Sequence, residues 1–158
     1  MRKRILAIIL VCLNTPALAQ STRWVYQSHV DPISGTQTMV AITAGDRGEA
    51  LTAGCSGGRP AVRVTTAHSD REIGDMREVT WRIDQTRPVT QIWKNQQQGG
   101  AMLSGSVAIE LIERLRDAQE HVVVHSGGHI AKFSVKGSTA AIKQLIADCP
   151  RLRTSSDN

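Results

Sequence analysis

Aromatic side chains are scarce in this chain: 3% of its 158 residues are Phe, Trp or Tyr. No internal repeat is visible, which argues against a solenoid. The motifs H-E-x-x-H and G-x-G-x-x-G and the P-loop are also missing. The spacing G-x-S-x-G occurs once, at 54–58, but no helix is predicted to follow it, so a β-turn is expected there. With 41% hydrophobic and 21% charged residues, the composition excludes a coiled coil, collagen or wholesale disorder and fits one globular domain.

The first residues have the pattern of a secretory leader. A cationic start at 2–4 precedes the uncharged apolar run Ile5–Leu13, which is about nine residues long where a membrane span needs about twenty. A small-x-small sequence then ends at Ala19. We predict a cleaved signal peptide over 1–19, with Gln20 opening a periplasmic or secreted chain. A retained N-terminal anchor is the alternative, and no stable membrane anchor is expected.

Removal of the leader changes the charge. It takes away three of the 19 Lys and Arg residues, so the net charge falls from +5 to +2 over the remaining 139 residues. Nucleic-acid binding needs a clustered cationic face. Arg77, Arg82 and Arg87 either form a small patch or are separate solvated charges, and we favour the second interpretation. No nucleic-acid partner is therefore expected.

Cleavage also removes one of the three cysteines. Cys12 leaves with the leader, and the preceding Val11 does not fit a lipobox. The remaining pair, Cys55 and Cys149, predicts a disulfide in an exported chain. Closing so long a loop is worth about 4–5 kcal/mol in the chain-entropy model. The alternative is two free thiols, one of them catalytic.

Short alternating segments dominate the first two thirds of the chain. Val79, Trp81 and Ile83 share one strand face, for example, and polar residues occupy the other. We predict strands over 24–27, 38–43, 51–55, 61–65, 79–84, 89–93, 122–124 and 130–135. The three tryptophans, Trp24, Trp81 and Trp93, lie in strand register and are expected mainly in the core, although exposed rings could bind a glycan or peptide.

Two helices follow most of the strands. Apolar spacing predicts one helix after Ser106 and another after Ser138, with each serine as an N-cap. Pro150 ends the second helix. The fold class is therefore α+β: an antiparallel β-rich, sandwich-like domain over 20–150, with two helices in its C-terminal part, closed by one disulfide. Residues 151–158 are expected to form a flexible tail.

Histidines are the main candidates for chemistry. His121, His125 and His129 flank a predicted hairpin. His121 and His125 would lie about 13 Å apart on one strand, too far to share a metal ion. His125 and His129 could approach across the turn, but a zinc site would still need a third or fourth ligand. His68 lies in a polar turn beside a serine and two carboxylates, but catalytic triads draw on separate elements. We expect no metal and no cofactor. A small envelope hydrolase using His68 or the three hairpin histidines is an alternative function.

Several segments together resemble a known family. They are Trp24-Val25, the strand ending at Cys55, Val79-Thr80-Trp81-Arg82-Ile83-Asp84, and Phe133-Ser134-Val135-Lys136-Gly137 before a helix that ends at Cys149. This set resembles the type VI secretion system-associated TagO (VasI) family of small exported proteins. It is more loosely similar to the invasion-associated locus B family. The resemblance implies an exported domain with no catalytic residues to carry over.

These observations predict a non-catalytic periplasmic accessory or binding protein, linked to type VI secretion by the resemblance, that acts through a protein partner in the cell envelope. Arg82, Asp84 and Trp93 are the candidate binding surface. A second alternative is an inhibitor or immunity protein that blocks a cell-wall enzyme with an exposed loop such as Gln96–Gly100.

Overall fold

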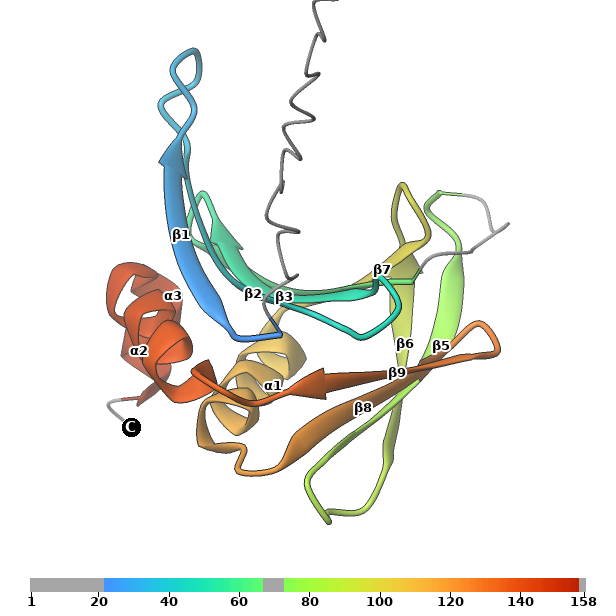
Figure 1. Cartoon of the computed structure of the whole chain (residues 1–158). Coiled ribbons are helices and arrows are strands. Elements are labelled where there is room, and N and C mark those ends of the chain that lie inside the picture. Colours follow the sequence, from blue (N-terminus) through green and yellow to red (C-terminus); the bar gives the residue numbers. More distant parts are fainter. Residues whose placement is uncertain (1–21, 67–72, 157–158) are drawn as a thin grey trace, which may run out of the picture.

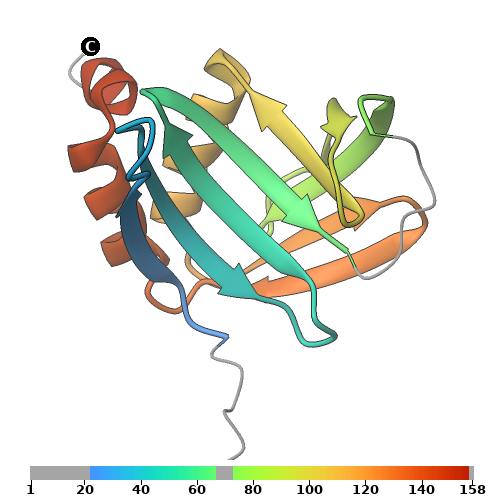
Figure 2. The same ribbon diagram turned by 90° about the horizontal axis from the view of Figure 1, so that it is seen from above.

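The computed structural model describes residues 22–66 and 73–156. The predicted signal peptide, with its Ala19–Gln20 junction, and His68 lie outside the described residues. Within them, nine strands form one antiparallel sheet that curls around its own inner face (Figures 1 and 2). The strands are β1 (Val25–Val30), β2 (Gln37–Ala44), β3 (Ala50–Ser56), β4 (Arg59–Thr65), β5 (Met76–Ile83), β6 (Val89–Asn95), β7 (Gly100–Ser104), β8 (His121–Ser126) and β9 (His129–Ser134).

The strand order is β1-β2-β3-β4-β7-β6-β5-β8-β9. Strand β7 was not predicted; it lies between β4 and β6 and so joins the two halves of the sheet. Its segment Gly-Ala-Met-Leu-Ser contains no β-branched or aromatic residue and therefore carries no strand signal. Five residue pairs join β7 to β4, and only Lys94–Met102 and Asn95–Ala101 pair it with β6.

The core lies against the inner face of this sheet. Alternate residues of each central strand point inward, as expected for Val79, Trp81 and Ile83, which are all buried. All three tryptophans are at most 4% exposed, which confirms that they are core residues. With so few rings available, most of the core surface comes from aliphatic side chains.

Three helices cover part of the inner face (Figure 2): α1 (Ser106–Asp117), α2 (Ser138–Asp148) and α3 (Pro150–Ser156). Buried apolar residues of α1 contact β4 and β7, and α2 packs on β1, β2 and β3. Both predicted N-caps were one residue late: the capping positions are Gly105 and Gly137, each at positive φ and without a side-chain cap.

The predicted tail is largely helical. Pro150 ends α2 as expected but also opens α3, since proline is well tolerated in the first turn of a helix. Leu152 is 1% exposed, so its side chain belongs to the core and the domain continues past residue 150. The assignment of 151–158 to a flexible tail is therefore wrong for this part of the chain.

The disulfide between Cys55 and Cys149 is present, with Cα atoms 6.0 Å apart and a sequence separation of 94. It ties β3 to the junction of α2 and α3, and both cysteines are buried. The α+β class, the antiparallel sheet, the C-terminal helices and the disulfide are thus confirmed. Among the described helices, none has the length and apolar character to span a membrane.

The sheet has two edges, β1 and β9. At the β9 edge, Gly45 in the β2–β3 turn forms a β-bridge with Phe133. Arg47 of the same turn donates a hydrogen bond to the Ile130 carbonyl. The β2–β3 turn thus covers the β9 edge and brings the sheet close to barrel closure through β2, which leaves β1 as the outermost strand.

Candidate functional site

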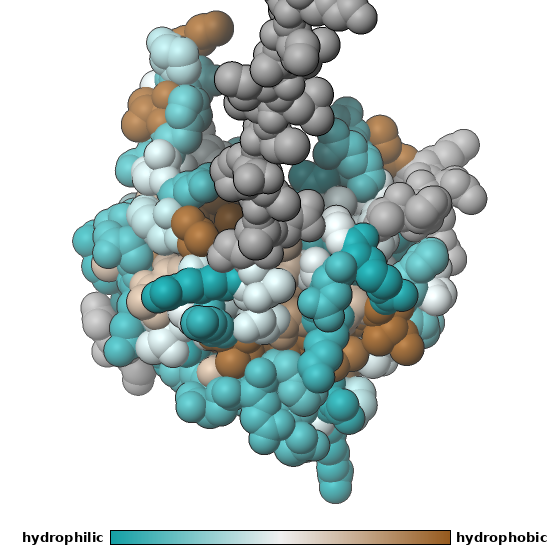
Figure 3. Space-filling model, viewed as in Figure 1, coloured by the Kyte–Doolittle hydropathy of each residue, from teal (hydrophilic) through white to brown (hydrophobic). Residues whose placement is uncertain are grey.

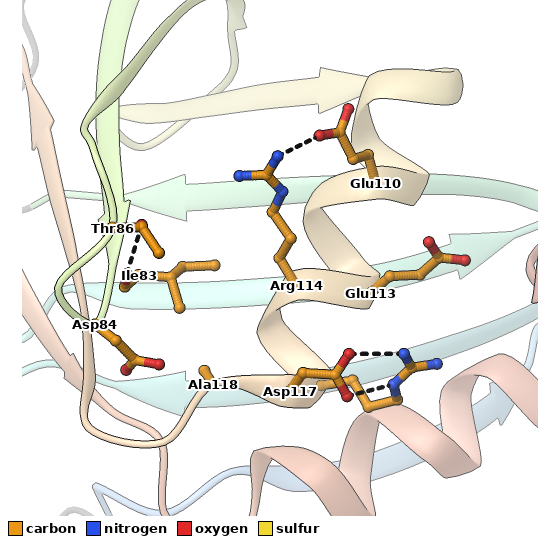
Figure 4. Close-up of a pocket in the computed structure, with 9 residues that line it drawn as sticks. Ile83, Asp84, Thr86, Glu110, Glu113, Arg114, Asp117 and Ala118 are labelled. Atoms are coloured by element: carbon orange, nitrogen blue, oxygen red, sulfur yellow. Dashed lines mark hydrogen bonds and ion pairs between the residues drawn. The ribbon is translucent and has the colours of Figure 1, made fainter.

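A cleft of about 590 Å³ lies between the β5–β6 turn and one face of α1 (Figure 4). Apolar Ile83 and Ala118 lie among its polar lining residues. The charged and polar groups around them are Asp84, Thr86, Glu110, Glu113, Arg114, Arg116 and Asp117. Two elements far apart in sequence therefore bring four carboxylates and two guanidinium groups into one surface depression.

Asp84 connects the β5–β6 turn to the segment before β8 at the base of this cleft. Its backbone has φ 52°, a left-handed conformation that Asp tolerates better than most residues. Its carboxylate accepts backbone N–H bonds from Gln119, Glu120 and His121 at 2.9, 2.7 and 3.1 Å. Desolvation opposes ionisation, but the three N–H donors outweigh it and lower the pKa of Asp84.

Both arginines of α1 that line the cleft are paired with carboxylates. Arg114 contacts Glu110 at 2.7 Å and lies 5.5 Å from the centre of the Trp81 ring, within range of a cation–π interaction. The Arg116 guanidinium donates two bonds to Asp117, and this pairing lowers the pKa of the Asp117 carboxyl. In Figure 4, Arg114 projects from α1 into the cleft.

These pairings limit what the cleft can do chemically. A general acid at neutral pH needs a carboxyl with a raised pKa. Here the pKa shifts of Asp84 and Asp117 are downward, so both are held ionised. The cleft is instead a fixed pattern of charges around a small apolar patch, which is an arrangement suited to recognition.

The candidate binding surface predicted from sequence is only partly brought together. Asp84 lines the cleft, whereas Arg82 points to the outer face of β5, opposite Val123 of β8. Trp93 is 1% exposed and packs in the core, so its assignment to a binding surface is wrong. It points inward because β6 alternates with Trp93 and Asn95 on the buried side.

The glutamine-rich loop Gln96–Gly100 is held by two arginines, and no sequence pattern predicted these contacts. Arg63 donates to the Gln97 carbonyl and Arg77 to the Gly99 carbonyl, each at 2.8 Å. Arg77 is 3% exposed and lies on the inner face, so it does not join Arg82 and Arg87 in a surface patch. The side chains of Gln97 and Gln98 stay exposed at the tip.

The three hairpin histidines do not converge. His121 and His125 lie on the outer face of β8, while His129 pairs with the inward-facing Ser126. The His121 Nδ1 lies 3.9 Å from Glu120. In residues 22–66 and 73–156 no group of three or more metal-ligating side chains comes together.

Comparison of this chain with protein-family models, with curated proteins and with solved structures finds no match in any of the three.

Proposed function

We propose that this chain is an exported, non-catalytic binding protein that acts on a protein partner in the cell envelope through the cleft between α1 and the β5–β6 turn. The observation that carries the proposal is the fixed charge pattern of the cleft. Asp84 is committed to three backbone N–H groups, and Glu110 and Asp117 are committed to arginines.

Pre-organised charges favour recognition because they do not have to be ordered on binding. The mixture of both signs fits a partner segment that carries both signs, and electrostatic complementarity of this kind selects among partners. The buried disulfide supports an oxidising compartment, in agreement with the predicted leader. Association with a type VI secretion system rests on the sequence resemblance alone.

Export is tested by the intact mass of the chain recovered from its native cell envelope. We expect loss of residues 1–19, so that the mature chain begins at Gln20. Ala19→Asp, which replaces the small residue at the cleavage position, should retain the leader. Recovery of the full-length chain in the cytoplasm would contradict the proposal.

Partner binding is tested by placing a photo-reactive amino acid at Glu113, which lines the cleft, in the cell that makes the protein. We expect an adduct of one defined mass. The matched control replaces Glu78, an exposed glutamate outside the cleft on β5. The cleft assignment fails if position 113 gives no adduct or the same adducts as position 78.

A second candidate function is inhibition of a cell-wall enzyme by the loop Gln96–Gly100. The two arginine bonds to its backbone favour this function, since inhibitory loops gain affinity when they are rigid before binding. Purified mature chain should then inhibit a lysozyme-type enzyme, and Gln97→Asp should weaken inhibition while Gln119→Asp should not. No inhibition by the unaltered chain would eliminate this candidate.

A further inference from the structure

The hydrogen-bonding direction of β1 can be read from its turn. Asp31 N–H donates to the Thr36 carbonyl across the β1–β2 hairpin, so Asp31 directs its backbone toward β2. Alternate residues of an antiparallel strand bond to opposite neighbours. Tyr26, Ser28 and Val30 therefore direct their N–H and C=O groups away from β2, toward the open side of the sheet.

Only the first part of this edge is closed by a backbone bond, and α2 packs against β1 beside it, where the Tyr26 hydroxyl donates to the Asp148 carboxylate. Trp24 N–H donates to the Lys136 carbonyl at 2.9 Å, which closes the edge just ahead of α2. Among the described residues, no backbone group bonds to the outward N–H and C=O groups of Tyr26, Ser28 and Val30. The open edge thus consists of three bonding positions, at residues 26, 28 and 30.

This edge lacks the features that usually prevent strand pairing. Its sequence Val-Tyr-Gln-Ser-His-Val has no Lys, Arg, Asp, Glu or Pro. The hairpin beyond it projects from the body of the molecule, and apolar atoms are visible on it in Figure 3. Val30 is 55% and Ile33 95% exposed. The Asp31 carboxylate braces the turn by accepting the N–H groups of Ile33 and Ser34.

We propose that β1 is a self-association surface: the β1 strands of two copies pair antiparallel about a two-fold axis at Ser28, so that the two nine-stranded sheets become continuous. The proposal does not depend on the envelope partner, because the purified chain alone is sufficient for pairing.

The open edge is complementary to itself. An antiparallel pair centred on Ser28 sets each Tyr26 opposite Val30 of the second copy and the two Ser28 residues opposite each other. All three open positions of both copies are then bonded. On the inner face this places an aromatic next to a β-branched side chain, a favourable cross-strand pair. On the other face Gln27 lies opposite His29, so no like-charged carboxylates or ammonium groups meet.

The contact is small. One strand pair buries less than the roughly 1,200 Å² of a standard interface, so the dimer should be weak and dependent on concentration. Sedimentation velocity of the purified mature chain, from about 1 µM to about 1 mM, covers the affinities expected of such an interface. The weight-average mass should rise from that of a monomer toward that of a dimer over this range.

Ser28→Pro is the decisive variant, because the N–H it removes points outward and the β1–β2 ladder does not use it. We expect at least about a tenfold weaker association, since the dimer loses both Ser28 donors and gains two proline rings at its centre. Ser28→Ala keeps the N–H and is the matched control, with unchanged association. Val30→Lys, which puts a charge on the exposed edge, should also weaken the dimer.

Circular dichroism and melting temperature establish that each variant is folded. If Ser28→Pro does not fold, Val30→Lys together with concentration-dependent amide exchange at Tyr26, Ser28 and Val30 tests the same surface. A chain that stays monomeric up to the highest concentration overturns the proposal. Dimers that persist in both the Ser28→Pro and the Val30→Lys variants also overturn the proposal. A chain that stays monomeric and binds a different protein through β1 overturns it as well.

Discussion

The two edge strands of the sheet, β9 and β1, differ in how far their backbone groups are covered. The β9 edge is covered by the β2–β3 turn through the Gly45–Phe133 bridge and the Arg47 bond to Ile130, whereas β1 presents three open bonding positions. An uncovered edge is a template for pairing with another chain. The β2–β3 turn covers the β9 edge, and no described turn covers β1 in the same way. This difference indicates that β1 is the side where contact with another chain is tolerated.

The largest expected effect comes from the disulfide, which anchors the helices behind the β1 side of the sheet. Replacing Cys55 and Cys149 together by Ser should lower the free energy of unfolding by about 2–5 kcal/mol, because the unfolded chain is no longer closed into a long loop. Urea unfolding measures this loss, and amide exchange should rise more in β1, α2 and α3 than in β8 and β9.

Reduction of the unaltered protein should reproduce the double variant. If the oxidised and reduced proteins had the same free energy of unfolding, the disulfide would not be what stabilises β1, α2 and α3.

A smaller effect is expected where the β9 edge is covered. A Cβ at Gly45 would lie 2.8 Å from the Glu49 Oε2 atom and 3.3 Å from the Phe133 ring. Glu49 is buried, and its Oε2 accepts the Arg47 N–H at 2.9 Å, so it cannot move without loss. Gly45→Ala should therefore cost about 1–3 kcal/mol and uncover β9.

The readouts are thermal unfolding and amide exchange at Ile130 and Lys132. The control is Gly48→Asn in the same turn, where a Cβ meets no atom within 4 Å and the cost is that of the positive φ of 87°, which Asn adopts more readily than most residues. If the two variants behave alike, the contact at Gly45 does not protect the edge.

The smallest effect concerns Asp84, which fixes the start of β8 beside the covered edge. Its pKa is lowered in the folded state, so its contribution is present above the unfolded-state value and is lost as pH falls below about 4 through the folded value. Asp84→Asn keeps a residue suited to φ 52° but removes the charge. The acid decrease in melting temperature should become shallower by a few degrees or less, because the carboxylate is partly solvated.

The pH profile of Asp46→Asn, in the exposed β2–β3 turn, is the matched control and should follow that of the unaltered chain. An Asp84→Asn profile identical to both would mean that the three N–H bonds contribute no net stability.

Much of the fold follows from local patterns. Alternation identified most strands, and composition with compartment predicted the Cys55–Cys149 pair. The order of the strands has no such local source: β4 pairs with β7 and β5 with β8, and these pairings depend on side-chain packing between distant segments. The weakly patterned β7 could be recognised only from the gap that it fills between β4 and β6.

The burial of two polar residues, Arg77 and Asn95, could have been predicted from the alternation of their strands. Extending the Val79, Trp81, Ile83 alternation by one step places Arg77 on the inner face, where the structure has it. The same step from Trp93 places Asn95 inside. The cleft was less predictable, because the Asp84 bonds depend on residues more than 30 positions away that only the folded chain brings near.

The disulfide also determines how the chain would respond to tension. A force applied at its two ends would pass through the Cys55–Cys149 bond, which excludes from stretching every residue between those cysteines. Ahead of the bond, β1, β2 and β3 could unzip and release roughly 30 residues, about 110 Å of extended chain. Behind it, the short α3 is the element of the described chain that could lengthen. An oxidised molecule thus has a built-in limit to its extension, and the strand at the open edge lies at the beginning of the part that yields.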